Sequence, residues 1–281
     1  MKASLRIAAV QMKFRPTIAG NAEHIVERVH TADADVVLFP ECALTGYRRE
    51  FVGLDAKGVA AGIAAVAQAA KDARRNVLLG TPTRARGKWF NSLLVFDRRG
   101  REVFRYSKIH LTESDARFFT PGNTLALFRL DGVPATAIIC HERRYPELVR
   151  LPVMMGAQIV FHPNAGLDTL AVSRSKRAGR DGIAVRAFEN QIFYVFANSV
   201  GPQGGGLWSA GDSKIVAPDG RVLALADHRE ETVLRAELSL AEAGRRFARE
   251  ALREPAFLRG AWKQMLAACR RQMRNQSSTT S

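Results

Sequence analysis

The sequence predicts a mixed α/β protein in which helices cover a large system of β-strands. Short apolar runs with the length of buried strands alternate with helical patterns in the outer parts of the chain, and hairpins recur between them. Because hairpins join antiparallel strands, a mixed sheet system fits better than a purely parallel one. The 281 residues contain no internal repeat and no long low-complexity linker, so we expect one main domain over residues 1–240.

The first half of the chain predicts a strand, a helix, a strand, a helix, a strand and a hairpin, in that order. Apolar residues at helical spacing predict the first helix, and a high content of alanine, the strongest helix former, predicts the second. Arg98-Arg99-Gly100 separates two strand-like runs and predicts the turn of the hairpin. The expected ranges are 5–12, 21–32, 35–39, 58–75, 77–80 and, for the hairpin strands, 90–97 and 102–106.

The second half predicts a loop, a strand pair, a helix, a strand, a helix, a strand and a final hairpin. Turn sequences at Asp131-Gly132 and Pro218-Asp219-Gly220 predict the two antiparallel pairs. Residues 201–211 include three successive glycines but lack the preceding strand and following helix of a phosphate cradle, so we expect a mobile surface loop there. The other expected ranges are 110–122, 125–130, 134–139, 148–155, 158–161, 177–190, 193–198, 213–216 and 222–226.

Beyond residue 240 the sequence becomes strongly basic. Residues 244–274 contain nine Arg or Lys and two Glu, and they predict two helical pieces separated at Pro255. We expect this extension, residues 241–274, to dock on the main domain or on a second subunit, with an acidic membrane surface as the alternative. Residues 275–281 are expected to form a disordered tail. Helical spacing gives the second piece one apolar face, made of Leu258, Trp262, Met265, Leu266, Cys269 and Met273.

The composition argues against several classes of protein. No apolar run approaches the roughly 18 residues of a membrane span, and the N-terminal residues enter a strand without a secretory segment. Cys42, Cys140 and Cys269 are too widely spaced for a disulfide framework or a cysteine metal site. The formal net charge of +15 attracts anions, but no nucleic-acid-binding motif accompanies it. We therefore expect a cytoplasmic protein without a membrane, metal, cofactor or specific nucleic-acid partner.

The stretch ATAIICHERRYPE, residues 135–147, carries the strongest chemical signal. An apolar strand ends there at Cys140, and a charged turn leads into the start of a helix. Proteins of the α/β class place nucleophiles and the backbone N–H donors for an oxyanion at such strand ends. Adjacent side chains of a strand point to opposite faces, so the His141 side chain is poorly placed to act as base. Its backbone N–H is the candidate oxyanion donor.

Two further charged residues also follow predicted strands. Glu41 comes after the strand 35–39, and Lys108 comes after the strand 102–106. Because the carboxyl ends of neighbouring strands converge on one crevice, we expect both side chains to meet Cys140 there. Hydrolysis by a cysteine needs a thiolate, a group that manages protons, and positive charge or N–H donors at the oxyanion, and these residues could supply them.

Several motifs resemble the signature regions of the nitrilase superfamily of carbon-nitrogen hydrolases. They are FPECALTGY (39–47), YSKIHL (106–111) and CHERRYPE (140–147), supported by FFTPGN (118–123), RAFENQIFYVFANSVG (186–201) and GDSKIVAPDGRVLA (211–224). The resemblance runs from the first strand to about Glu237, in the order and spacing of the family. It implies a four-layer α-β-β-α sandwich that often forms homodimers or higher homo-oligomers.

The resemblance also implies roles for the three residues at strand ends. Cys140 would be the nucleophile, Glu41 the general base that later serves as acid, and Lys108 the group that stabilises the oxyanion. Cys42, next to Glu41, would then be a packing residue whose side chain points away from the crevice.

Two positions depart from the family pattern. The family commonly has Asp two residues after the nucleophile, whereas this chain has Glu142, which is one methylene longer. Many members also have a second Glu in the loop after the lysine. Spacing places that carboxylate at Asp115, with Glu113 as the alternative.

The implied function is hydrolysis of a small amide or N-carbamoyl compound to an acid and ammonia, through a thioester on the cysteine. A nitrilase that converts a nitrile to acid and ammonia is the first alternative, and a non-catalytic or polyanion-binding protein is the second. Arg144 is expected to be structural and to pair with Glu147. Arg143 either binds a substrate carboxylate or is simply solvated. The candidates for substrate binding are Tyr47, Arg143, His162 and Asn164.

Overall fold

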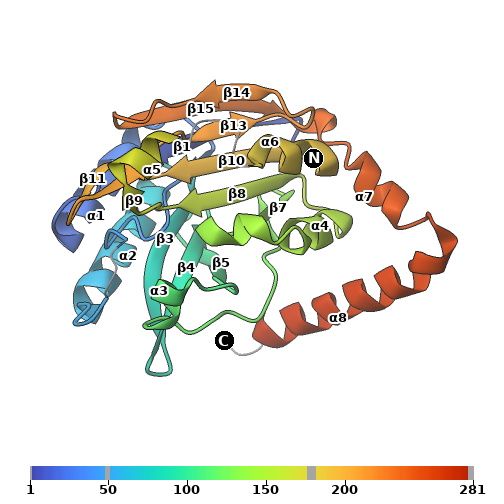
Figure 1. The fold of residues 1–281 in the computed structure, drawn as a ribbon, viewed down its shortest axis with the longest axis horizontal. Helices are drawn as coiled ribbons and strands as arrows, with labels where there is room; N and C mark the ends of the chain where they lie inside the picture. The colour runs from blue at the N-terminus through green and yellow to red at the C-terminus, as the bar shows by residue number, and fades with distance from the viewer. Residues whose placement is uncertain (1, 48–50, 176–181, 278–281) are drawn as a thin grey trace.

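The computed structural model describes residues 2–47, 51–175 and 182–277, which form two six-stranded mixed sheets flanked by helices and a smaller three-stranded sheet (Figure 1). Both large sheets contain parallel and antiparallel pairs. The mixed α/β class and the four-layer arrangement are therefore confirmed.

The first sheet has the strand order β15-β1-β2-β3-β4-β5. Its outer face is covered by two helices, α1 (Ile18–Thr31) and α2 (Ala56–Asp72). The strand at its edge, β15, lies in a segment for which the sequence pattern predicted no element. The strand bounds are β15 Thr232–Ser239, β1 Ser4–Gln11, β2 Val36–Leu38, β3 Asn76–Ala85, β4 Lys88–Phe96 and β5 Glu102–Ser107.

The second sheet has the order β14-β13-β10-β8-β7-β6. Helices α4 (Glu147–Met154) and α6 (Ile183–Asn190) cover its outer face. Of the helix predicted over 177–190, the structure shows Ile183–Asn190 as α6, and residues 177–181 lie outside the described residues. The strand bounds are β14 Val222–Leu225, β13 Lys214–Val216, β10 Phe193–Asn198, β8 Ile159–Asn164, β7 Val133–Ala137 and β6 Phe128–Leu130.

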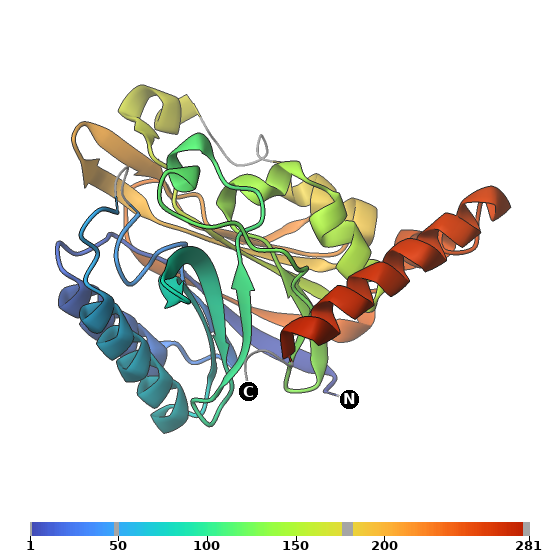
Figure 2. The same cartoon turned by 90° about the horizontal axis from the view of Figure 1, so that it is seen from below.

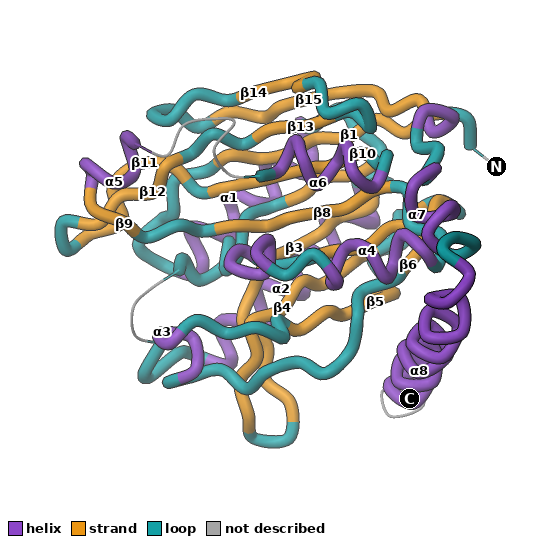
Figure 3. Tube along the Cα trace, turned by 45° about the vertical axis from the view of Figure 1, so that its right-hand side comes forward, coloured by secondary structure: helices purple, strands orange, loops and turns teal. Residues whose placement is uncertain are grey.

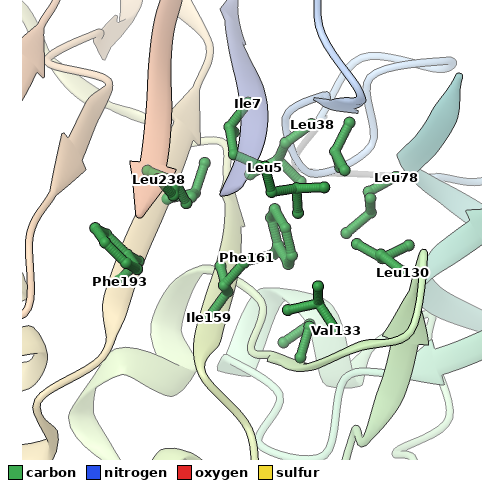
Figure 4. Packing of buried hydrophobic residues seen from close by; sticks show 14 of the residues in the cluster. Leu5, Ile7, Leu38, Leu78, Leu130, Val133, Ile159, Phe161, Phe193 and Leu238 are labelled. Carbon is green, nitrogen blue, oxygen red and sulfur yellow. The ribbon is translucent and has the colours of Figure 1, made fainter. Parts of the chain in front are cut away.

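The alternation of side chains along each strand produces three apolar layers. In β1, Ile7 and Ala9 face the second sheet, whereas Ala8 and Val10 face α1 and α2. The central layer between the two sheets contains side chains such as Phe161 and Leu238 (Figure 4). Figure 2 shows the resulting order of layers: helices, sheet, sheet and helices.

The small sheet corrects the prediction of a loop over 201–211. Strands β11 (Val200–Gly204) and β12 (Leu207–Ala210) form a hairpin there, and β12 also pairs with β9 (Asp168–Thr169), which leads into α5 (Leu170–Ser175). The two turn residues, Gly205 and Gly206, have φ angles of +57° and +72°. Positive φ at both positions is what a type I′ hairpin turn requires, so the glycines make the turn of a hairpin.

The C-terminal extension contains the 3₁₀ turn η2 (Leu240–Glu242), helix α7 (Arg246–Ala251), the 3₁₀ turn η3 (Ala256–Leu258) and helix α8 (Arg259–Ser277). Leu266 of α8 is buried in the cluster on the outer face of the second sheet, and Trp262 and Cys269 pack beside it. Met265 is 45% exposed and does not belong to this contact, contrary to the predicted apolar face. Much of α8 extends away from the two large sheets in Figure 2, and Figure 3 shows it almost end-on beside them.

The helix continues through Ser277, so the predicted disordered tail does not begin at residue 275, and 278–281 lie outside the described residues. Docking of α8 on a second subunit stays a prediction. Among the helices that the structure describes, none has both the length and the hydropathy of a membrane span.

Candidate active site

The residues predicted at strand ends meet at one site between the two large sheets. Glu41 follows β2 and Lys108 follows β5. Strands β2 and β3 are parallel, and β4 is antiparallel to both β3 and β5, so β5 runs in the same direction as β2. The carboxyl ends of β2 and β5 therefore lie at the same edge of the first sheet. Cys140 follows β7 of the second sheet and begins the 3₁₀ turn η1 (Cys140–Arg144). The crevice is therefore formed by two facing sheets, not by one open sheet.

Glu41 is fully buried and every partner of its carboxylate is a hydrogen-bond donor. Its Oε1 accepts from Lys108 Nζ at 2.8 Å and from Asn91 Nδ2 at 2.8 Å, and its Oε2 accepts from the Ala165 N–H at 3.1 Å. Burial raises the pKa of Glu41, and the Asp115 charge adds to this, whereas Lys108 and Asn91 oppose it. A carboxylate with a raised pKa is a stronger base than an ordinary Glu.

Asp115, and not Glu113, is the second carboxylate beside the lysine. Asp115 lies on the short helix α3 (Glu113–Ala116), and its Oδ2 is 2.7 Å from Lys108 Nζ. Burial lowers the pKa of Lys108, whereas the charges of Glu41 and Asp115 raise it. The charges together have the larger effect, so the pKa of Lys108 lies well above its usual value. Lys108 is therefore a permanent cation at neutral pH. Glu113 is exposed to solvent.

The capping geometry of α3 fixes Asp115. The Thr112 side chain accepts from the Asp115 N–H at 3.1 Å, and Asp115 Oδ2 accepts from the Thr112 N–H at 3.2 Å, which together make a capping box. Tyr47 donates its hydroxyl to Asp115 Oδ1 at 2.7 Å. Tyr47 thus lines the pocket and also holds the carboxylate in place.

Cys140 is partly exposed to the pocket and has a left-handed backbone with φ of +50°. Burial and the charge of Glu41 raise the pKa of its thiol to about 12, although Lys108 and Arg143 lower it. The thiol is therefore protonated at neutral pH, and it needs a base to become a nucleophile.

His162, a candidate for substrate binding, is fully buried, is absent from the pocket lining and supports the backbone of Cys140. Its Nε2 lies 3.0 Å from the Cys140 carbonyl oxygen, and its Nδ1 lies 2.8 Å from the Tyr194 hydroxyl. Since a carbonyl only accepts, Nε2 carries the proton and Nδ1 accepts from Tyr194. Burial and the nearby Arg143 charge hold the pKa of His162 well below its usual value, so the ring is neutral.

The pocket beside Cys140 has a volume of about 710 Å³ and a charged mouth. Asn164 lines it, and the Asn164 amide lies 2.8 Å from the Asn198 side chain. Arg144 NH1 lies 2.5 Å from His141 Nδ1, so its predicted partner, Glu147, is replaced by His141. Arg143 is half-buried in the wall, and it forms no hydrogen bond or ion pair with the part of the chain that the structure describes.

Three residues at the site escaped the sequence prediction. Asn91 holds Glu41, Asn198 holds Asn164, and Tyr106 contacts Glu142. A polar residue inside an apolar strand, such as Asn91 in WFNSLLVF, is the signal that could have found them, because a buried amide needs partners. Cys42 is buried near Asn91 and away from the pocket lining. Within the described ranges, no group of three His, Cys, Asp or Glu residues is arranged to hold a metal ion.

Comparisons with known proteins agree with this geometry. The family profile described as "Carbon-nitrogen hydrolase" matches residues 6–246. An (R)-stereoselective amidase from Pseudomonas sp is 31% identical over 86% of this chain and 88% of its own length. A 2-oxoglutaramate amidase from Bacillus subtilis is 30% identical over 79% of this chain and 84% of its own length.

A nitrilase from Pyrococcus abyssi has a similar degree of likeness, being 30% identical over 84% of this chain and 90% of its own length. Among solved structures, a cysteine-to-alanine variant of the amidase from Nesterenkonia sp. AN1, in complex with butyramide, has a TM-score of 0.78. It is 25% identical and covers 92% of this chain and 97% of its own. The fold, the motifs and the family match together show that this chain belongs to the carbon-nitrogen hydrolases of the nitrilase superfamily.

Proposed function

We propose that the protein hydrolyses the C–N bond of a small amide through a thioester on Cys140. The observation that carries this proposal is the fully buried array of Glu41, Lys108 and Asp115 beside a partly exposed thiol in a pocket. Burying one cation between two carboxylates costs much solvation free energy, which a purely structural core avoids with apolar residues. Charged arrays of this kind cluster at catalytic sites.

In the first half of the reaction, Glu41 takes the proton of the Cys140 thiol as the sulfur attacks the amide carbon. The pKa of the thiol is raised to about 12, so the thiol does not ionise alone, and the raised pKa of Glu41 makes it a suitable base. Lys108 and the His141 N–H stabilise the oxyanion. The tetrahedral intermediate then collapses, the C–N bond breaks, and Glu41 returns the proton to the leaving nitrogen, so that ammonia departs.

In the second half, water hydrolyses the thioester. Glu41 removes a proton from the water as its oxygen attacks the acyl carbon, and the same oxyanion donors act again. The C–S bond then breaks, the sulfur regains a proton from Glu41, and the carboxylic acid is released. Asp115 serves by orienting Lys108, which it contacts directly.

The substrate proposed here carries a carboxylate. Arg143 is a half-buried guanidinium in the pocket wall without a hydrogen-bond partner among the described residues, and a planar guanidinium binds a carboxylate with two parallel bonds. The name of the 2-oxoglutaramate amidase among the relatives describes an acidic amide. Small amides and N-carbamoyl compounds that bear a carboxylate are therefore the first substrates to test.

A panel of matched compounds tests both parts of the proposal. Ammonia release is measured for an amide, an N-carbamoyl compound and a nitrile, each prepared with and without a carboxylate. We expect turnover of the acidic amide or N-carbamoyl compound, loss of turnover in Cys140→Ala, and a rise in KM of roughly tenfold or more in Arg143→Met for acidic compounds alone. Arg144→Met is the matched control.

The outcomes of the panel separate the alternatives. Turnover of the nitrile with little turnover of either amide overturns the amidase assignment in favour of a nitrilase. An equal KM for acidic and neutral compounds removes the role of Arg143. Full activity in Cys140→Ala removes the thioester mechanism altogether.

A further inference from the structure

Glu142 connects the two backbone segments that carry the nucleophile and the lysine. Its Oε2 accepts from the Ile139 N–H at 2.7 Å, just before Cys140 in the chain. Its Oε1 accepts from the Ile109 N–H at 2.7 Å and the His110 N–H at 3.2 Å, just after Lys108. The side chain is fully buried, and it is absent from the pocket lining, so it does not touch a substrate in the pocket.

The bridge needs a carboxylate because every one of its partners donates. Besides the three backbone N–H groups, the Tyr106 hydroxyl lies 2.8 Å from Oε1 and 2.9 Å from Oε2. Burial raises the pKa of Glu142 to about 7, against the Ile139, Ile109 and Tyr106 hydrogen bonds, which lower it, so the ionised form that accepts at both ends predominates above about pH 7 and the variants are compared there. An ionised carboxylate accepts at both ends, whereas an amide accepts at one end and presents N–H groups at the other.

A stacked pair of rings adds a second connection between the same segments. The His110 and Tyr145 rings are parallel within 2° and their centroids are 3.5 Å apart. Tyr145 directly follows η1, so the segment after Lys108 contacts both the turn that begins at Cys140 and the residue after it. Both connections therefore join the segment after Lys108 to the turn that begins at Cys140.

We propose that Glu142 is a positioning residue whose carboxylate sets the placement of Cys140 relative to Lys108. The proposal rests on the amide hydrolysis proposed above and deepens it. Cys140 adopts a left-handed backbone conformation that only a few per cent of non-glycine residues adopt, and the bond to Ile139 closes the turn that holds this conformation. The extra methylene relative to Asp is what lets one side chain reach Ile139 and Ile109 together.

Glu142→Gln is the main test, because Gln has nearly the same shape but cannot accept at both ends. A displacement of about 1 Å in a catalytic group costs roughly 100-fold in rate, so we expect kcat to fall roughly 10- to 100-fold while KM changes less than about threefold. In Glu142→Asp the carboxylate is retained but shortened, and we expect an intermediate loss of kcat. Tyr106→Phe removes one donor and leaves the bridge, so its kcat should stay within about fivefold of wild type.

Val133→Ala is the matched control for stability, since Val133 is buried in β7 and lies in the layer between the sheets. The second readout is the rate at which iodoacetamide alkylates Cys140, which needs no substrate. We expect Glu142→Gln to slow alkylation roughly tenfold and Val133→Ala to leave it unchanged. If Glu142→Gln fails to fold, the comparison of Glu142→Asp with Val133→Ala decides.

Wild-type kcat and alkylation in the folded Glu142 variants overturn the positioning role, as does an equal loss of both in Val133→Ala. If the wild-type protein hydrolyses no amide, the proposed function fails. The alkylation rates then still decide whether Glu142 positions Cys140, so the two failures are distinguishable.

Discussion

Replacing Asp115 by Asn tests whether Lys108 depends on its second carboxylate. Asp115 accepts three hydrogen bonds, from Lys108 at 2.7 Å, Tyr47 at 2.7 Å and the Thr112 N–H at 3.2 Å. Asn keeps only one acceptor, so its amide is expected to turn the oxygen towards Lys108 and the Thr112 N–H and the NH₂ group towards the Tyr47 hydroxyl, whose oxygen can accept. Lys108 then keeps a hydrogen bond at this position but loses the negative charge of its second carboxylate.

The size of the effect follows from the burial of the pair. Breaking a buried ion pair costs about 3–5 kcal/mol. Since Lys108 keeps its bond to Glu41, we expect the lower end, about 3 kcal/mol, in the free energy of unfolding. The loss of this negative charge beside the ammonium should lower kcat/KM roughly 100-fold on an amide substrate.

Urea unfolding and steady-state ammonia release measure the two effects. Glu113→Gln is the matched control for stability alone, because Glu113 lies on the same short helix and is exposed, although it also lines the pocket, and its stability should stay within about 0.5 kcal/mol of wild type. The reasoning is refuted if Asp115→Asn retains wild-type stability and activity, or if Glu113→Gln causes an equal loss of stability.

The remaining predictions concern pH and the C-terminal helix. Burial and the Asp115 charge raise the pKa of Glu41, so the acid limb of kcat/KM should lie above 4.5, the ordinary pKa of a Glu, and a limb at or below that pH would contradict the role of Glu41 as base. The pKa of Glu142 is raised from 4.5 to about 7, so its stabilising contribution is full below about pH 4.5 and is lost as the pH rises to about 7. Urea unfolding at several pH values should show that the free energy of unfolding falls by about 3 kcal/mol less in Glu142→Gln than in wild type over this pH range. Parallel pH curves for the two proteins would contradict the raised pKa of Glu142. Leu266→Ala should lower the free energy of unfolding by about 2 kcal/mol while Met265→Ala changes it by less than about 0.5 kcal/mol, and equal effects would contradict the observed face of α8.

The strand ends were predictable from the sequence because strand-like runs stop abruptly at polar or charged segments. This pattern indicates Glu41, Lys108 and Cys140 as residues at strand ends. It could not tell that Cys140 belongs to a second sheet that faces the first, since strand pairing depends on contacts that are distant in the chain.

Side-chain direction was the main property that the sequence could not provide. His162 lies in β8, where all six residues are buried, so no alternation of polar and apolar residues shows which side chains face the pocket. Met265 and Leu266 both belong to the predicted apolar face of α8, but only Leu266 reaches the body. Glu142 was recognised as a departure from the family pattern, yet its bridging contacts with Ile109 and Ile139 join segments thirty residues apart and needed the structure.

The most direct test of the mechanism is the mass of the intact protein, quenched with acid within the first turnover of an amide substrate. We predict a mass increase equal to the acyl group minus one hydrogen, located on the peptide that contains Cys140 and absent in Cys140→Ala. Ammonia release without an adduct on that peptide, together with activity in Cys140→Ala, would contradict the thioester mechanism.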